Sequence, residues 1–343
     1  MNENPVTWEK GRLRDELSSF GYRPSQELRS VVLVGGKGTR LSPQRKLLHQ
    51  KDYPELDQEH WGSEGPKGLA MVNMRTEREV VAKPMTDWHL DVHVSCEEVR
   101  HITLSFGVSS EVMIQYYRRR HRSRYRGVPL DFIVERRPAG TLAPIIKLHQ
   151  QGRLPEGPMV YANGDNLMDI DLYLCYLCGC LLACRLGGDP QEVVIDVVSL
   201  VPWQESHSYG TVDLDFDSGR VRGFHEKAPV EENVHVSLDG QELTPINSGF
   251  SIIVNPRAIF SEYLTDEVIE TSCELEKGSL DYRQHESLVK YEKLYETIAR
   301  SGRMIAVHLP TYWTDLGTEE KISAAEQVFS TTRVAQRAAG ESI

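Results

Sequence analysis

The stretch that decides the fold is SVVLVGGKGTRL, residues 30–41. Its first five residues are mostly valine and leucine, a run typical of a buried strand. The run leads directly into three glycines, Gly35, Gly36 and Gly38, which allow backbone N–H groups to face an anion. Arg40 adds a planar fork of donors that matches phosphate oxygens. The stretch therefore predicts a strand followed by a phosphate-binding loop.

Two common phosphate loops do not match this stretch. A Walker loop needs Ser or Thr after its lysine, whereas Lys37 is followed by Gly38, and no glycine stands five residues earlier. The Rossmann fingerprint does not match either, because its third glycine is missing. A glycine-rich turn also occurs where the backbone simply needs a positive φ angle. The role of the loop therefore depends on the rest of the chain.

Beyond this loop, strand-like hydrophobic runs alternate with helical patterns. The predicted strands are 101–106, 130–135, 158–163 and 192–201, and the predicted helices are 84–99, 109–122, 141–150 and 169–185. This alternation predicts an α/β fold with a doubly wound, mainly parallel sheet and helices on both faces. The pattern then predicts a β-hairpin at 209–227, a strand at 249–254, a helix at 284–301, a strand at 303–309 and a closing helix at 318–338.

Two segments are predicted to be additions to this core. Residues 1–29 form an N-terminal extension, in which an amphipathic helix is expected to pack on the domain through Trp8, Leu13, Leu17 and Phe20. Residues 42–65 are polar and interrupted by proline and glycine, which predicts an inserted loop that is either a lid, a binding element or disordered. The main domain is therefore expected at 30–322, with a C-terminal helix and tail at 323–343.

Composition excludes several classes of protein. Of 343 residues, 39 are Lys or Arg and 50 are Asp or Glu, so the formal charge is 39 − 50 = −11 at pH 7. This balance disfavours a protein whose whole surface binds nucleic acid. No apolar run approaches the roughly 18–20 residues that a membrane-spanning helix needs. The first thirty residues lack the apolar core of a secretory signal, which predicts a cytoplasmic protein.

Four of the six cysteines gather at Cys175, Cys178, Cys180 and Cys184. Their spacing lacks the paired C-x2-C units of a structural zinc site. The surrounding residues 169–188 are almost all apolar, and cysteine behaves as a small hydrophobic residue in such a helix. We therefore predict packed thiols here rather than a metal or redox site.

A basic run at 118–126 holds six arginines in nine residues and lies beside Tyr116, Tyr117 and Tyr125. Basic and aromatic residues together can bind RNA or another polyanion. The run also ends a predicted helix, where positive charge favourably meets the negative end of the helix dipole. A solvated or subunit-contact face is the favoured interpretation, and a polyanion or regulatory anion site is the alternative.

Six blocks of residues, in order, resemble the sugar-1-phosphate nucleotidylyltransferases, also called nucleotide-sugar pyrophosphorylases. The resemblance covers about residues 30–322. The blocks are the 35–41 loop, Gly65–Leu69, Glu135 with Ala139–Ala143, Asn163–Asp165, Tyr209-Gly210 with Phe224–Pro229, and Asn247–Gly249 with Trp313–Thr318. The resemblance implies a Rossmann-like fold of the glycosyltransferase A type, in which the hairpin is a small sugar-binding subregion.

The reaction that this resemblance implies is attack of a sugar-1-phosphate oxygen on the α-phosphorus of a nucleoside triphosphate, which releases pyrophosphate. Because both reactants are anionic, such catalysis depends on positioning and charge neutralisation. By resemblance, Asp165 and Asp315 hold Mg²⁺, an ion that prefers oxygen ligands. Arg40 and Lys67 are expected to bind the triphosphate, and Lys227 the sugar phosphate. Arg40, Lys67, Asp165 and Lys227 are therefore the expected catalytic residues.

Two departures from the family pattern concern Lys67. It follows Arg40 by 27 residues, a longer interval than is usual in the family, and Gly68 stands where a second proline is common. Lys46, which lies within the insertion, is the alternative to Lys67, and a solvated surface lysine is the other interpretation. The role of the insertion itself stays open.

The resemblance also implies two binding sets. The nucleotide is expected at Gly35, Gly36, Gly38, Thr39, Arg40, Glu135, Gly140 and Thr141. The sugar phosphate is expected at Asn163, Gly164, Tyr209, Gly210, Glu226, Lys227, Asn247 and Gly249. Glu226 is expected to accept hydrogen bonds from sugar hydroxyls.

Few residues of the sequence indicate which base and which sugar the protein binds. Glu135 can accept hydrogen bonds from the N1–H and the amine of guanine, which favours GTP, with a manno- or heptose-type phosphate or a cyclitol phosphate as acceptor. Glu135 could also face solvent, and uridylyltransferases carry an acidic residue nearby. A thymidylyl- or uridylyltransferase acting on glucose-1-phosphate is therefore the alternative.

A rival of another class is a catalytically silent subunit that binds nucleotide sugars and regulates a partner enzyme. The extension, the insertion and Gly68 support it. Asp165, Asp315, Arg40 and Lys227 are all present, which favours the enzyme. The expected partners are the two substrates, without nucleic acid or membrane, and homo-oligomers are common in the family. Oligomeric state, pathway and the identity of both substrates stay open.

Overall fold

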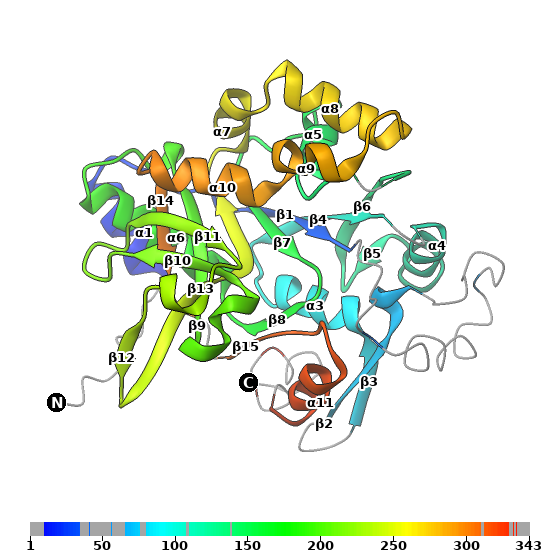
Figure 1. Ribbon diagram of the computed structural model, residues 1–343, viewed down its shortest axis with the longest axis horizontal. Helices are drawn as coiled ribbons and strands as arrows, with labels where there is room; N and C mark the ends of the chain where they lie inside the picture. Colours follow the sequence, from blue (N-terminus) through cyan, green and yellow to red (C-terminus); the bar gives the residue numbers. More distant parts are fainter. Residues whose placement is uncertain are drawn as a thin grey trace.

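The structure is a computed structural model, which describes residues 10–34, 41, 56, 66–75, 80–107, 110–137, 139–309, 312–328, 332 and 334. Within these residues the chain folds around one large sheet (Figure 1). The central strands are parallel neighbours in the order β7, β1, β4 and β6. Their bounds are Leu28–Leu33 for β1, Val99–Phe106 for β4, Val128–Val134 for β6 and Met159–Asn163 for β7.

The register of these strands brings their carboxyl ends to one edge of the sheet. Leu33 at the end of β1 pairs with Ser105 of β4 and with Asn163 of β7. The loop after β1 therefore begins beside the loop after β7. Ligands of open α/β sheets bind at this edge. The strand register alone therefore indicates where a binding site is expected.

The second half of the sheet is antiparallel around one long strand, β13. β13 pairs with both β7 and β9, while β14 runs parallel to β9. The bounds of this half are Val194–Pro202 for β9, Gly210–Leu214 for β10, Val221–Glu226 for β11, Val236–Leu238 for β12, Gln241–Ile253 for β13 and Met304–Val307 for β14. The sheet is therefore mixed, with its parallel part in the first half of the chain.

Two faces of this sheet are buried, as the doubly wound prediction requires. Val31 and Val32 are adjacent in β1 and point to opposite faces, and they belong to two separate hydrophobic clusters. One face is covered by α1 (Lys10–Ser19), α3 (Met85–Val94), α4 (Ser110–His121) and α6 (Leu172–Arg185). The other is covered by α5 (Ala143–Gln150), α7 (Pro256–Tyr263) and α10 (Tyr291–Arg300). The predicted α/β class is confirmed.

Two small antiparallel pairs lie outside the large sheet and were not predicted. β8 (Asn166–Asp169) pairs with β15 (Tyr312–Asp315), and β2 (Met71–Arg75) pairs with β3 (Val80–Pro84). The β8–β15 pair joins segments that are almost 150 residues apart in the chain. A four-residue strand carries too little periodicity to be recognised from sequence.

The helix predicted at 284–301 is wrong as a single element. The structure has α9 (Tyr282–Val289) and α10, separated by the extended Lys290. The carbonyl oxygen of Val289 accepts the backbone N–H of Leu142 at 2.9 Å. The carbonyl of Val289 thus forms its hydrogen bond with the loop before α5 and not with the next turn of a continuing helix. The helix is interrupted at this point, and α10 begins at Tyr291. Ahead of this pair lies α8 (Asp266–Lys277), which was not predicted.

The predicted N-terminal helix is present as α1, which packs against α6. Leu13 and Leu17 are buried, whereas Phe20 is half exposed, so Phe20 does not share the buried face. Trp8 lies outside the described residues. In α6, Cys175 and Cys180 are fully buried, which agrees with the interpretation as packed thiols for these two, whereas Cys178 and Cys184 are partly buried.

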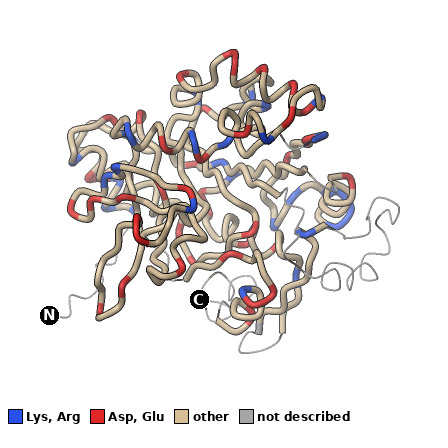
Figure 2. Tube along the Cα trace, viewed as in Figure 1, with Lys and Arg blue, Asp and Glu red and all other residues tan. Residues whose placement is uncertain are grey.

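The aromatic residues of the basic run face the core rather than a ligand. Tyr116 and Tyr117 donate to the buried Asp87 at 2.6 and 3.0 Å, and Tyr125 donates to Asp91 at 3.1 Å. The run itself begins in the last turn of α4, where Figure 2 shows a concentration of basic residues. The tyrosines are therefore not available to stack on a nucleic acid.

The closing helix is present as α11 (Glu319–Val328), and most of the predicted 318–338 after Val328 lies outside the described residues, which continue only at 332 and 334. Among the described residues, no helix combines the length and the apolar character that crossing a membrane requires.

Candidate functional site

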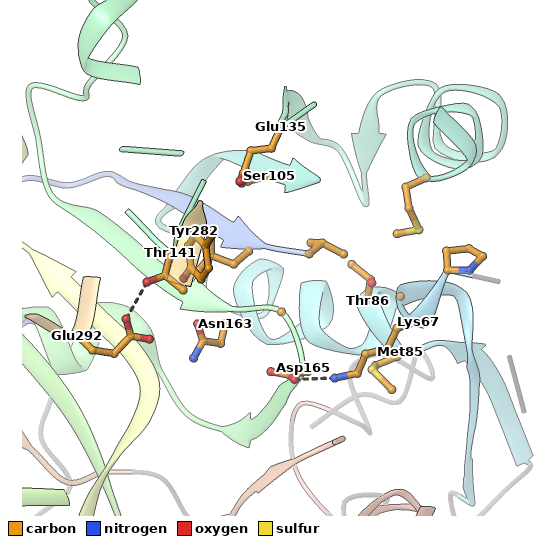
Figure 3. Close-up of a pocket in the computed structure, with 17 residues that line it drawn as sticks. Lys67, Met85, Thr86, Ser105, Glu135, Thr141, Asn163, Asp165, Tyr282 and Glu292 are labelled. Carbon is orange, nitrogen blue, oxygen red and sulfur yellow. Dashed lines mark hydrogen bonds and ion pairs between the residues drawn. The ribbon is translucent and has the colours of Figure 1, made fainter. Parts of the chain in front are cut away.

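A cavity of about 440 Å³ opens at the carboxyl edge of the parallel strands (Figure 3). It is lined by the ends of β1, β4, β6 and β7 and by the loops that follow them. Seven of the predicted site residues contribute to it: Lys67, Glu135, Gly140, Thr141, Asn163, Gly164 and Asp165. The predicted Gly35, Gly36, Gly38, Thr39 and Arg40, and the alternative Lys46, lie outside the described residues. Leu33 and Val34, which lead into that loop, line the cavity.

Two of the lining glycines are required by close backbone approach. Gly164 donates its N–H to the carbonyl oxygen of Leu33 at 2.8 Å, and a Cβ atom on it would lie 2.6 Å from that oxygen. Gly140 has φ of +97°, and its Cβ would lie 2.3 Å from the carbonyl oxygen of Val289. Both positions therefore need glycine to bring the loops of β7 and β6 against their neighbours.

The two predicted metal carboxylates are brought together by the β8–β15 pair. Asp315 pairs with Asn166, the residue after Asp165, and the N–H of Leu316 donates to the carbonyl oxygen of Asp165 at 2.7 Å. One oxygen of Asp315 accepts the N–H of Gly317 at 3.0 Å, which orients the carboxylate. Two adjacent carboxylates offer the hard oxygen ligands that Mg²⁺ prefers. This donor set fits the expected ion.

Each of these carboxylates is paired with a lysine. Lys67 Nζ lies 2.6 Å from Asp165 Oδ2, and the Lys67 side chain is 11% exposed (Figure 3). The interpretation of Lys67 as a solvated surface lysine is therefore wrong. Lys321 Nζ contacts Asp315 Oδ2 and also the hydroxyl of Tyr209 at 2.7 Å. Lys321 was not predicted, because it lies beyond the Trp313–Thr318 block and no motif marks it.

Glu135 lies at the end of β6 with its carboxylate in the cavity wall. Its two oxygens accept from Ser105 Oγ and from the backbone N–H of Ala139, both at 3.3 Å. Burial raises the pKa of the Glu135 carboxyl above its ordinary value. The alternative that Glu135 faces bulk solvent is wrong for this arrangement, since the residue lines the cavity.

A second carboxylate, Glu292, lines the same cavity and was not predicted. Thr141 Oγ1 donates to Glu292 Oε2 at 2.7 Å and accepts the backbone N–H of Tyr291 at 2.8 Å. Figure 3 shows Glu292 reaching toward Thr141, with Asn163 nearby. The residue comes from the start of α10, so it reaches the site only because the chain breaks at Lys290. The sequence carries no signal for this approach.

The predicted sugar-phosphate residues of the hairpin do not line the cavity, and one of them, Tyr209, contacts Asp315. Gly210 pairs with Glu226 across the hairpin, and Glu226 forms an ion pair with Lys227 at 3.1 Å. Lys227 has φ of +52° and donates its backbone N–H to the carbonyl oxygen of Tyr209 at 3.1 Å. The hydroxyl of Tyr209 in turn lies 3.4 Å from Asp315 Oδ2.

Asn247 and Gly249 border a small cavity of about 30 Å³ together with Asn163 and Glu292. The Asn247 amide donates to the buried Asp196 at 2.7 Å, and its oxygen accepts the N–H of Gly249 at 2.8 Å. Burial raises the pKa of Asp196 to about 8. The Asn247 side chain is therefore held by the core beneath the site.

Beneath Asp165, two buried histidines of α3 support the strand that follows it. His89 Nδ1 lies 2.7 Å from the carbonyl oxygen of Asn166, which makes Nδ1 the donor. His89 Nε2 is then the acceptor for His93 Nε2 at 3.1 Å, and His93 Nδ1 accepts from Ser30 Oγ at 2.9 Å. Burial lowers the pKa of both imidazoles. This neutral chain links β8 to β1 and was not predicted.

Comparison with known sequences finds no matching family model. The chain is similar to the mannose-1-phosphate guanylyltransferase catalytic subunit beta of Danio rerio, with 23% identity over 290 residues, which cover 84% of this chain and 61% of the relative. It is also similar to the D-glycero-alpha-D-manno-heptose 1-phosphate guanylyltransferase of Aneurinibacillus thermoaerophilus, with 23% identity over 213 residues, which cover 61% of this chain and 74% of the relative. The chain thus spans under two thirds of the first relative's length.

Among solved structures, the chain resembles HddC from Yersinia pseudotuberculosis complexed with GMP-PN, with 20% identity, a TM-score of 0.55, and coverage of 88% of this chain and 99% of that one. It also resembles a putative glucose-1-phosphate thymidylyltransferase from Bacillus anthracis, with 15% identity, a TM-score of 0.55, and coverage of 89% and 96%. These likenesses support the fold described above.

Proposed function

We propose that the chain is a sugar-1-phosphate nucleotidylyltransferase, which transfers a nucleoside monophosphate from a nucleoside triphosphate to a sugar-1-phosphate. The products are pyrophosphate and a nucleoside diphosphate sugar. One observation carries this proposal. The backbones of Asp165 and Asp315 lie on neighbouring segments at the carboxyl edge of the sheet, and each side chain forms an ion pair with a lysine.

The chain's own groups suit a reaction between two anions. Lys67 lies in the cavity wall beside Asp165, where its ammonium would neutralise charge on the triphosphate. Asp165 and Asp315 would hold Mg²⁺, which supplies charge neutralisation and orientation of phosphate oxygens when bound. A protein nucleophile is not required, because direct in-line attack needs positioning and electrostatic stabilisation.

We favour GTP as the nucleotide. Glu135 and Glu292 both line the cavity, and an ionised carboxylate only accepts hydrogen bonds. Guanine presents two adjacent donors, its N1–H and its amine, to such an acceptor. The similar proteins that are named as guanylyltransferases support this choice. A thymidylyl- or uridylyltransferase acting on glucose-1-phosphate is the alternative.

We place the acceptor sugar over the hairpin. Lys227 would bind its phosphate and Glu226 its hydroxyls, as the resemblance implies. The backbone N–H of Lys227 donates to the carbonyl oxygen of Tyr209, and the hydroxyl of Tyr209 lies 3.4 Å from Asp315, so Tyr209 connects Lys227 to the proposed metal ligand. A manno- or heptose-type phosphate, or a cyclitol phosphate of similar shape, is the expected acceptor.

The test is to incubate the protein with Mg²⁺, each nucleoside triphosphate and a panel of sugar-1-phosphates while pyrophosphate is measured. The proposal expects release with GTP and one manno- or heptose-type acceptor, and release that depends on both substrates. If no pair gives pyrophosphate, while GDP-sugars still raise the unfolding temperature, the silent binding subunit is supported instead.

A further inference from the structure

Lys321 is a positively charged residue beside Asp315 to which the proposed reaction assigns no role. Lys321 lies in the first turn of α11 and contacts Asp315 Oδ2 with its ammonium. The same ammonium also donates a hydrogen bond to the hydroxyl of Tyr209 at 2.7 Å and lies 4.8 Å from the centre of the Tyr209 ring. Lys321 therefore binds one of the two carboxylates expected to hold the metal ion.

A divalent ion and this ammonium compete for the same carboxylate. The contacted oxygen of Asp315 is Oδ2, while Oδ1 is held by the N–H of Gly317 at 3.0 Å. A cation that approaches Oδ2 meets the ammonium at short range, where like charges repel strongly. Binding of the ion is therefore favoured when the ammonium moves to another anion.

We propose that Lys321 binds the phosphate of the sugar-1-phosphate. In the free protein its ammonium forms an ion pair with Asp315, and this ion pair would break when Asp315 binds a divalent ion. This assignment rests on the proposed function. The lysine would act as a substrate ligand, and before substrate binds it would lower the affinity of the site for the ion.

Tyr209 contacts both Lys321 and Lys227, the residue that is expected to bind the phosphate. The backbone of Tyr209, whose hydroxyl contacts Lys321, also accepts the N–H of Lys227 at 3.1 Å. Trp313 packs edge-on against the Tyr209 ring at 5.4 Å and donates to the carbonyl oxygen of Ser248 at 2.8 Å. Tyr209 is thereby fixed, and the flexible four-carbon stem of Lys321 can turn about it toward Lys227.

The charges of the site support this movement. In the free protein, two carboxylates and their two lysines sum to zero. A bound divalent ion would add two positive charges to this neutral set. The two phosphate groups that react then meet a site with an excess of positive charge. An ion without substrate would leave this excess unbalanced, so ion and substrate should bind cooperatively.

The test uses the full chain with Lys321→Met, which keeps the length of the side chain and removes its charge, and with Lys321→Arg, which keeps the charge. Lys277→Met is the matched control, because Lys277 is an exposed lysine at the end of α8 that pairs with Glu274. Affinity for Mn²⁺ is measured by titration without substrates. The Michaelis constants for both substrates are then measured with Mg²⁺, and thermal unfolding checks that each variant folds.

We expect Lys321→Met to bind Mn²⁺ about tenfold more tightly than the parent, the change that loss of one screened charge interaction corresponds to. The same variant should raise the Michaelis constant for sugar-1-phosphate about tenfold or more and leave that for the nucleotide within about twofold. Lys321→Arg should resemble the parent in both measurements, and so should Lys277→Met.

Unchanged or weaker Mn²⁺ binding by a folded Lys321→Met variant would overturn the proposal, as would an unchanged Michaelis constant for the sugar phosphate. If Lys321→Met unfolds, Lys321→Gln is measured in its place with the same expectations. Failure of the proposed function is distinguishable, because the parent would then release no pyrophosphate while the Mn²⁺ titration still reports on Lys321.

Discussion

The backbone N–H of Leu316 donates to the carbonyl oxygen of Asp165 at 2.7 Å, across 151 positions of sequence. This bond lies at the end of the β8–β15 pair and brings the loop after β7 against the loop before α11. The two carboxylates expected to bind Mg²⁺ are neighbours because of it. Backbone pairing therefore places the two proposed metal ligands on neighbouring segments.

Asp165→Asn should abolish most of the activity. The change removes one charge from the proposed ion site and leaves Lys67 without its ion-pair partner. We expect kcat to fall about 100-fold or more, since the metal supplies several kcal/mol of charge stabilisation. Asp217→Asn, in the turn of the hairpin, is the exposed control. Activity within twofold of the parent in Asp165→Asn would contradict the assignment.

Glu135→Gln should weaken discrimination for GTP. Gln offers a donor and one acceptor in place of two acceptors, so about tenfold or more of kcat/KM for GTP relative to UTP should be lost. Burial raises the pKa of Glu135, so falling pH protonates it earlier than an ordinary glutamate. The Michaelis constant for GTP should therefore rise on the acid side in the parent and stay flat in the variant. Parallel pH profiles would contradict this role.

Gly164→Ala should destabilise the fold at the site. The added Cβ would lie 2.6 Å from the carbonyl oxygen of Leu33, which is backbone and cannot turn aside. A loss of about 1–3 kcal/mol in the free energy of unfolding is expected, together with lower activity. Gly11→Ala in α1 is the control, because its Cβ meets nothing within 4 Å and alanine favours helix. Equal stability of the two variants would count against this close approach.

The buried Asp196 should make stability depend on pH. Its folded-state pKa of about 8 is raised above the unfolded value of 3.8 by burial. Stability is therefore fully present below the unfolded pKa and is lost as pH rises toward 8, by up to about 1.4 kcal/mol per pH unit. Denaturation by urea between pH 5 and pH 9 should show the loss in the parent and not in Asp196→Asn. A constant difference between them across this range would refute the shift.

The parallel half of the fold was predictable because its strands are continuous apolar runs with a strong signal. SVVL in β1 is buried on both faces, and its one polar residue, Ser30, does not obscure the strand signal. The long β13 was predicted only at its apolar end, 249–254, because its first half, QELTPINS, reads as polar. Tertiary pairing with β9 makes that half a strand.

The site also contains residues that the sequence predicted and residues that it did not. Asp165, Lys67 and Glu135 were recognised through short motifs that lie next to strand ends. Glu292 and Lys321 carry no motif, and they reach the site through helices whose position depends on a chain break at Lys290 and on the β8–β15 pair. Their roles depend on contacts between distant segments, which sequence spacing does not encode.

The most direct test of the central claim is phosphorus NMR of the reaction of GTP, Mg²⁺ and a manno- or heptose-type 1-phosphate with the parent chain. We expect the resonances of a diphosphate ester to grow in equal amount with those of pyrophosphate, and Asp315→Asn to lose both. Absence of a diphosphate ester with every nucleoside triphosphate and acceptor tested would contradict it.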